Sequence, residues 1–110
     1  MNNIFENIPE PVGDEVFEII LKERNIQIER IVSTGQKTPE GQWLSQEFDE
    51  WVILLKGKAI ISFKANQEEI VMKSGDYILI KAYEEHRVEY TSEKEKSIWL
   101  AIHFKSTLPE

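Results

Sequence analysis

Two short stretches, residues 43–57 and 75–90, contain side chains that could bind a metal ion or a polar ligand. Gln46 and Glu50 lie in the first stretch and His86 in the second. Gln46 and Glu50 are four residues apart, so in an extended chain both side chains point to the same side. Together with imidazole, their oxygens could hold a divalent metal such as zinc, manganese, iron or nickel. A simpler interpretation, in which His86 is a hydrogen-bonded core residue and Glu50 a solvated rim residue, stays open.

A second histidine, His103, lies on the same face of the last apolar run as Trp99. If that face lines a cavity, His103 is a fourth candidate ligand; if the opposite face does, His103 points away. We expect the first arrangement, because an interior histidine beside tryptophan suits a ligand pocket. Trp43 and Tyr90 are further candidates for the pocket wall, Tyr90 because it alternates onto the face of His86. The two tryptophans could equally fill the core.

From residue 26 onward the sequence has the pattern of short β-strands. Runs rich in β-branched and aromatic residues are separated by turn signals. Regular short strands without intervening helices favour a sandwich or barrel over a parallel sheet. We therefore predict an all-β domain of about seven to nine strands. The predicted strands cover residues 26–33, 50–55, 59–64, 68–73, 76–81, 86–91 and 97–104.

Residues 1–25 have a different pattern. Two prolines and a glycine among the first 13 residues favour an irregular arm. In residues 14–24 the apolar side chains recur at helical spacing, and Asp14 could cap the first turn. We predict one short helix there, packed on a barrel of residues 26–110, in a chain with a single domain.

Composition limits the classes of function. The absence of cysteine excludes disulfides, a thiolate nucleophile and a sulfur-based metal site. A net charge of -7 opposes binding to the phosphates of nucleic acid. No apolar run approaches the roughly 20 residues that cross a bilayer, and the N-terminus lacks the pattern of a signal peptide. We expect a cytoplasmic protein with no nucleic-acid partner, no membrane contact and no nucleotide cofactor.

The strand predicted at residues 50–55 is apolar on both faces. If Glu50 points inward with Val52, then Trp51 and Ile53 point outward. An exposed apolar stripe of this kind needs a cover. The predicted helix could cover one sheet and a second copy of the chain the other, so we predict a homodimer.

At these positions the chain resembles the cupin superfamily, specifically its small single-domain bacterial members. Cupins have two short motifs, of which the first ends in Glu-x6-Gly and the second has a fixed spacing from glycine to histidine. Glu50 and Gly57 keep the first of these features. Gly75 and His86 keep the second without a gap. The resemblance covers about residues 30–104.

The chain also departs from the motifs of that family. The two histidines of the family's His-x-His fall at Leu44 and Gln46, so one metal ligand is lost and another becomes an amide oxygen. The family's Pro-x-Gly falls at residues 81–83, and its final asparagine at Tyr90. Only two of the four ligands implied by the resemblance are therefore unchanged.

The resemblance implies a double-stranded β-helix, a small jelly-roll barrel with its pocket between two sheets, commonly paired as a dimer. Because cupins include many kinds of protein, the fold does not determine the function. We expect a domain that binds a small molecule, with or without a divalent metal, in the barrel pocket. The alternatives are a metal-dependent enzyme of isomerase, dioxygenase or lyase type, and a barrel that serves only as an interaction surface.

Overall fold

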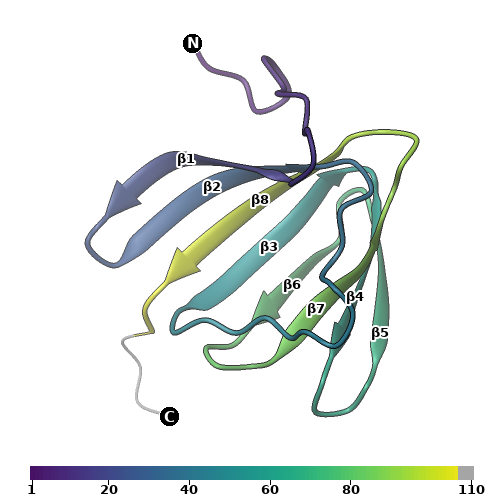
Figure 1. Ribbon diagram of the computed structural model, residues 1–110. Helices are drawn as coiled ribbons and strands as arrows, with labels where there is room; N and C mark the ends of the chain where they lie inside the picture. The colour runs from purple at the N-terminus through teal and green to yellow at the C-terminus, as the bar shows by residue number, and fades with distance from the viewer. Residues whose placement is uncertain (107–110) are drawn as a thin grey trace.

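The computed structural model describes residues 1–106, which contain eight β-strands in two antiparallel sheets. The broad sheet has the strand order β1-β2-β8-β3-β6 and the narrow sheet the order β5-β4-β7. Figure 1 shows the narrow sheet on the right, behind the broad one. The strands are β1 (Val16–Glu23), β2 (Ile26–Ser33), β3 (Asp49–Lys56), β4 (Lys58–Phe63), β5 (Glu69–Lys73), β6 (Tyr77–Ile80), β7 (His86–Thr91) and β8 (Ser97–Phe104).

The prediction of an all-β domain is confirmed. All seven predicted strands are present, and their ends differ from the prediction by no more than one residue. Period-two alternation located them well because strands buried on one face must keep that alternation. The last four residues of the predicted barrel, 107–110, lie outside the described part of the chain.

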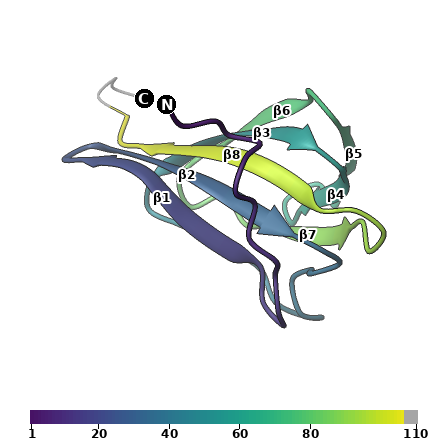
Figure 2. The same ribbon diagram turned by 90° about the horizontal axis from the view of Figure 1, so that it is seen from above.

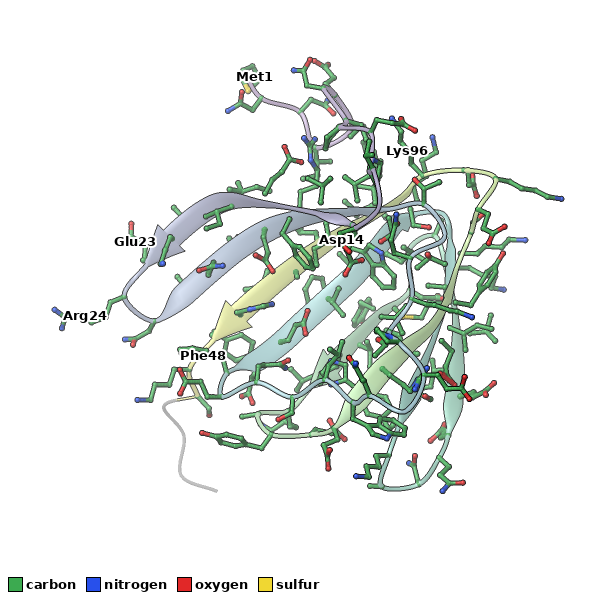
Figure 3. All side chains as sticks on the ribbon, in the orientation of Figure 1. Met1, Asp14, Glu23, Arg24, Phe48 and Lys96 are labelled. Carbon is green, nitrogen blue, oxygen red and sulfur yellow. The ribbon has the colours of Figure 1, made fainter. Side chains whose placement is uncertain are left out.

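The helix predicted for residues 14–24 is wrong, because this segment forms β1. β1 pairs antiparallel with β2 from Val16↔Val32 to Glu23↔Ile26, and Figure 3 labels Glu23 at the far end of this hairpin. The apolar spacing was carried mostly by β-branched and aromatic residues, which suit a pleated strand. Pairing with β2 also supplies backbone hydrogen bonds along the whole segment, whereas a short isolated helix is marginal. None of residues 1–106 is helical, and so no helix there could cross a membrane.

The hydrophobic core lies between the two sheets. In the broad sheet, alternate residues of β2, β8 and β3 point toward the narrow sheet, and full burial of a large aliphatic side chain contributes roughly 1.5–3 kcal/mol. Leu54 and Ala101 are fully buried there, and Met72 of the narrow sheet is 1% exposed. The buried core residues are Ile31, Val52, Leu54, Ala59, Ile61, Phe63, Met72, Ile80, Trp99 and Ala101.

The N-terminal arm covers part of the outer face of the broad sheet. Arg30 on β2 points outward, and its guanidinium donates hydrogen bonds to the backbone carbonyls of Ile4, Glu6 and Asn7. Its Nε also donates to Glu18 on β1 at 2.7 Å. Figure 2 shows the arm crossing the sheet from outside. One buried arginine therefore fixes the path of a segment that has no regular structure of its own.

The remainder of that outer face is apolar. Trp51 of β3 pairs with Leu79 of β6, and Ile53 with Tyr77. The rings of Trp51 and Tyr77 lie 5.4 Å apart between centroids. Tyr77 is 66% exposed and Leu79 46%. Within residues 1–106, none of the hydrogen bonds of the N-terminal arm reaches these four side chains. The arm is instead held at Arg30, which donates to three of its carbonyls.

Gly57, which separates β3 from β4, packs closely against Ser97. Its φ is +104°, and an added Cβ would lie 2.8 Å from Ser97 Cα and would also clash with the Ser97 hydroxyl. The left-handed backbone alone costs about 1–3 kcal/mol for a non-glycine residue. We expect Gly57→Ala to lower the free energy of unfolding by more than about 3 kcal/mol in urea denaturation. The matched control Gly75→Ala has φ +96° but no neighbour within 4 Å of its Cβ, so it should lose only the backbone term. Equal losses in the two variants would contradict the role of Ser97.

Candidate functional site

A cavity of about 250 Å³ lies between the two sheets, beside the hydrophobic core. This volume is somewhat smaller than the roughly 300–1,000 Å³ of sites for drug-sized ligands, so it suits a small molecule. Most of its wall is apolar, with several carboxylates and two histidines. Its lining residues are Glu15, Phe17, Glu29, Ile31, Leu44, Ser45, Gln46, Glu50, Val52, Ile61, Ile80, His86, Val88, Thr91, Trp99 and His103.

A row of polar side chains crosses the inner face of the broad sheet at one end of this cavity. His103 of β8 is the direct partner of Glu50 on β3 and of Gln27 on β2. Directly opposed residues in antiparallel strands place their side chains next to each other on one face. Glu29, two residues after Gln27, points to the same face and accepts a hydrogen bond from the Gln27 amide at 3.2 Å. The strand register itself therefore assembles this row.

His103 lies between two carboxylates. Its Nε2 is 3.4 Å from a Glu50 oxygen and 3.6 Å from a Glu29 oxygen. Both distances are longer than a hydrogen bond, so the contacts are electrostatic and become ion pairs when the imidazole is protonated. The Glu50 carboxylate, with a smaller contribution from Glu29, raises the pKa of His103 above its ordinary value of 6.5, against the opposing effect of burial. The two carboxylates therefore favour the protonated form of His103.

A third carboxylate enters the cavity from Glu15, the residue directly before β1. Glu15 accepts a hydrogen bond from the Ser33 hydroxyl at 3.0 Å. Burial raises the pKa of Glu15 above its ordinary value of 4.5, the Ser33 hydrogen bond opposes this, and the charges of Glu50 and Asp14 add to it. Glu15 and Glu50 thus repel each other across the cavity.

Residues 43–57 and 75–90, the two stretches identified in the sequence, meet at the start of β7 in the narrow sheet. Leu44 and His86 form an antiparallel bridge, in which the Leu44 N–H donates to the His86 carbonyl at 2.7 Å and the reverse bond is 3.0 Å. The Tyr83 N–H donates to the Gln46 carbonyl at 2.7 Å. These backbone bonds bring Gln46 and His86 to the cavity that Glu50 and His103 also line. All four predicted ligand residues therefore line one cavity.

Gln46 and His86 have different hydrogen-bonding states. The buried Gln46 amide nitrogen has no hydrogen-bond partner among the described residues. His86 Nδ1 lies 2.9 Å from the Glu84 carbonyl, so Nδ1 donates a hydrogen bond there, and in the neutral imidazole Nε2 is then an acceptor. The cavity thus offers one unused donor and one unused acceptor on this side.

Two of the predicted wall residues do not line the cavity. A β-bulge in β7 leaves Glu89 without a partner on β4, so the alternation reverses after Val88. Tyr90 consequently points outward, 44% exposed, and Thr91 takes the inward place. Trp43 lies outside because it packs on Arg87, whose guanidinium carbon is 5.8 Å from the ring centroid. Trp99, by contrast, is 5% exposed and lines the cavity.

Glu15 and Glu29 were missed as site residues. Glu15 fell in the segment interpreted as a helix, so no inner face was assigned to it. Glu29 lies within the strand predicted at residues 26–33, where it alternates onto the same face as Ile31. A charged residue on the core face of an otherwise apolar strand was the signal that could have revealed it.

The donor groups fit a metal ion poorly. Within residues 1–106 no group of three or more His, Cys, Asp and Glu side chains is arranged to hold a metal. Leu44 supplies no donor, and Gln46 supplies only a neutral amide. Glu50 already pairs with the imidazole of His103. A divalent ion would therefore find one free imidazole nitrogen, on His86, and no uncommitted carboxylate beside it.

Two antiparallel sheets around a cavity of this kind define a jelly-roll barrel. Residues 31–103 match the Cupin domain family. Because this match covers more than half of the chain, the protein belongs to the cupin family. A search among curated proteins gave no match.

Solved structures agree with this assignment. A candidate mannose-6-phosphate isomerase from Ralstonia eutropha JMP134 is 36% identical, with 96% of this chain and 98% of that chain covered and a TM-score of 0.91. A cupin superfamily protein from Desulfitobacterium hafniense DCB-2 is 16% identical, with 90% and 84% covered and a TM-score of 0.73. A protein with a double-stranded β-helix domain from Klebsiella pneumoniae is 14% identical, with 99% and 92% covered and a TM-score of 0.77. The last two show the fold alone.

The raised pKa of Glu15 gives a stability prediction. An acid whose folded pKa is raised costs no stability below its unfolded pKa, and the cost grows as pH rises above the unfolded pKa and is complete above the folded pKa. Glu15→Gln keeps an acceptor for Ser33 but cannot ionise. We expect its melting temperature to match the parent at pH 4 and to exceed it at pH 7. A calorimetric scan at both pH values checks this, with Glu47→Gln as an exposed control. A lower melting temperature for Glu15→Gln at pH 7 would contradict the prediction.

Proposed function

We propose that this cupin domain protein binds a small molecule rich in hydrogen-bond donors in the cavity between its sheets. The observation that carries the proposal is the set of three carboxylates, from Glu15, Glu29 and Glu50, in the wall of a mostly apolar cavity. An ionised carboxylate accepts hydrogen bonds and cannot donate them. A ligand that donates several hydrogen bonds, through hydroxyl or amino groups, complements this wall.

The unused groups opposite support the same class of ligand. His86 Nε2 is an acceptor, because its other ring nitrogen is committed to the Glu84 carbonyl. The Gln46 amide nitrogen is a donor without a partner among the described residues, so a ligand oxygen would relieve a buried unsatisfied group. Trp99 supplies an apolar surface for the carbon skeleton.

The sequence left open a divalent metal, such as zinc, manganese, iron or nickel, at Gln46, Glu50, His86 and His103. The ion pair between Glu50 and His103 competes with that role, because both groups would have to leave it to bind the metal. The proposed function therefore does not depend on a metal.

A second candidate is an enzyme that moves a proton, as an isomerase does. His103, whose pKa is raised by Glu50, could act as a general acid at neutral pH, and Glu50 could accept a proton in return. The relative from Ralstonia eutropha, which is described as a candidate isomerase of a sugar phosphate, supports this reaction type. We rank binding first because the arrangement of the side chains in the cavity does not identify a substrate on which they would act.

A barrel serving only as an interaction surface is the least supported alternative. Such a barrel should have an interior filled by side chains, whereas a cavity of about 250 Å³ is present. A cytoplasmic location remains a prediction.

Binding to the cavity can be tested with a panel of small hydroxyl and amino compounds. The indole N–H signal of Trp99 in NMR spectra should shift with the compounds that bind, and Glu50→Gln should weaken binding on the order of tenfold. The exposed Glu69→Gln should bind as the parent does. The affinity of a compound that binds should be the same in the presence of EDTA as in the presence of added zinc or manganese. Absence of any Trp99 shift would refute the proposal, and a strict need for zinc or manganese would favour the metal site instead.

We also propose that a second copy of the chain covers the bare outer face formed by Trp51, Ile53, Tyr77 and Leu79. These side chains carry no formal charge, whereas the whole chain carries -7. Two copies can therefore approach through this face with less repulsion than through any acidic one. Its burial would contribute about 25 cal/mol per Å² of apolar area.

Light scattering at micromolar concentration tests the pairing. We expect a mass twice the 12.9 kDa of one chain. Trp51→Glu should halve that mass, because a buried unpaired carboxylate in each copy opposes contact. Val71 is 64% exposed on the narrow sheet, so Val71→Glu should leave the mass unchanged. A parent protein that is monomeric under these conditions would refute the dimer.

A further inference from the structure

We infer that the ligand of the cavity is a small organic cation, an amine with a short apolar chain, rather than a phosphorylated or carboxylated compound. This inference rests on the proposed function and narrows the class of ligand. It depends on the charges that surround the cavity, on where they lie along its wall, and on the aromatic surface between them.

The charges of the cavity wall are unbalanced. Three carboxylates line it, and no lysine or arginine within residues 1–106 does. The only cationic partner is His103, which is shared between Glu29 and Glu50. Lys22 and Arg24 line a neighbouring hollow that also touches His103, so they stand outside this cavity. An anionic group placed inside would meet repulsion on several sides, and the one cationic group there, the imidazole of His103, is already shared by two carboxylates.

The carboxylates approach from different strands. Glu15 directly precedes β1 and lies beside Ser33, and Glu29 and Glu50 lie on β2 and β3. Their side chains are largely withdrawn from water, with 9% exposure for Glu29 and 13% for Glu50. Carboxylates this buried are costly unless they gain a positive partner. A cation between them would supply that partner and relieve the repulsion between Glu15 and Glu50.

The remaining wall fits an organic cation better than a metal ion. Trp99 and Phe17 line the cavity with several aliphatic side chains. Phe17 is 56% exposed on β1, the edge strand of the broad sheet. Aromatic faces attract ammonium groups, and aliphatic walls bury hydrocarbon chains. A hydrated metal ion would use neither surface.

The inferred ligand differs in charge from mannose 6-phosphate, the sugar phosphate in the description of the relative from Ralstonia eutropha. A phosphate monoester brings up to two negative charges and needs arginine, lysine or a set of backbone amides around it. The described lining of this cavity offers no such group except the unpaired amide of Gln46 and the shared imidazole of His103. We therefore expect the specificity of this chain to differ from that name.

Three probes with one carbon chain test the charge directly: butylammonium, butanol and butyrate, each titrated into the full chain at pH 7. Binding is followed by the Trp99 indole signal. We expect butylammonium to bind at least about tenfold more tightly than butanol, and butyrate not to bind. Glu15→Gln and Glu29→Gln should each reduce the preference for butylammonium over butanol several-fold. Glu47→Gln, which removes the same charge from an exposed position outside the cavity, should not.

The outcomes separate this inference from the proposed function. Equal binding of butanol and butylammonium, or tighter binding of butyrate, would overturn the cation and leave a small-molecule site. A preference for butylammonium that survives both Glu15→Gln and Glu29→Gln would also overturn it, because the charge would then act from outside the cavity. If no probe and no compound of the hydroxyl and amino panel shifts Trp99, the proposed function fails as well. Melting curves of each variant establish that it is folded.

Discussion

The site depends on the register of β8 between β2 and β3. Because His103 is paired with Gln27 on one side and with Glu50 on the other, three polar side chains share one row on the inner face. Trp99 lies two rows along the same strand and faces the same way. A shift of one residue would turn the polar row and the tryptophan outward together. The apolar core and the polar site are therefore specified by one set of backbone hydrogen bonds.

The same arrangement places stability and binding in opposition. The core side chains that close the sandwich, such as Leu54 and Ala101, are fully buried, whereas Glu15, Glu29 and Glu50 occupy inward positions that apolar residues could have filled. Burial raises the pKa of Glu15, a sign that its charge is poorly solvated. A fold that keeps costly carboxylates beside a dry core has the balance expected of a binding site.

Much of this could be predicted from the sequence, for physical reasons that also explain the failures. Alternation located β2, β7 and β8 because one face of each strand is buried, and it set His103 beside Trp99. It failed at Tyr90 because the bulge at Glu89 adds a residue that no pattern along one strand reveals. It failed for β1 because an amphipathic segment of eight residues fits either period, and only pairing with β2 decides. Glu15 was lost with that segment.

The division between the family segment and the rest of the chain has a consequence for specificity. The match to the cupin family begins at residue 31, so Glu15 and Glu29 both precede it, while Glu50, His86 and His103 lie within it. The matched segment supplies the barrel, the apolar floor and the histidines. The segment before residue 31 adds two of the three carboxylates, Glu15 and Glu29, and the aromatic side chain of Phe17. In the proposed cation site, two of the three carboxylates thus come from outside the matched segment, so relatives that share the barrel can differ in the charge of the ligand that they select.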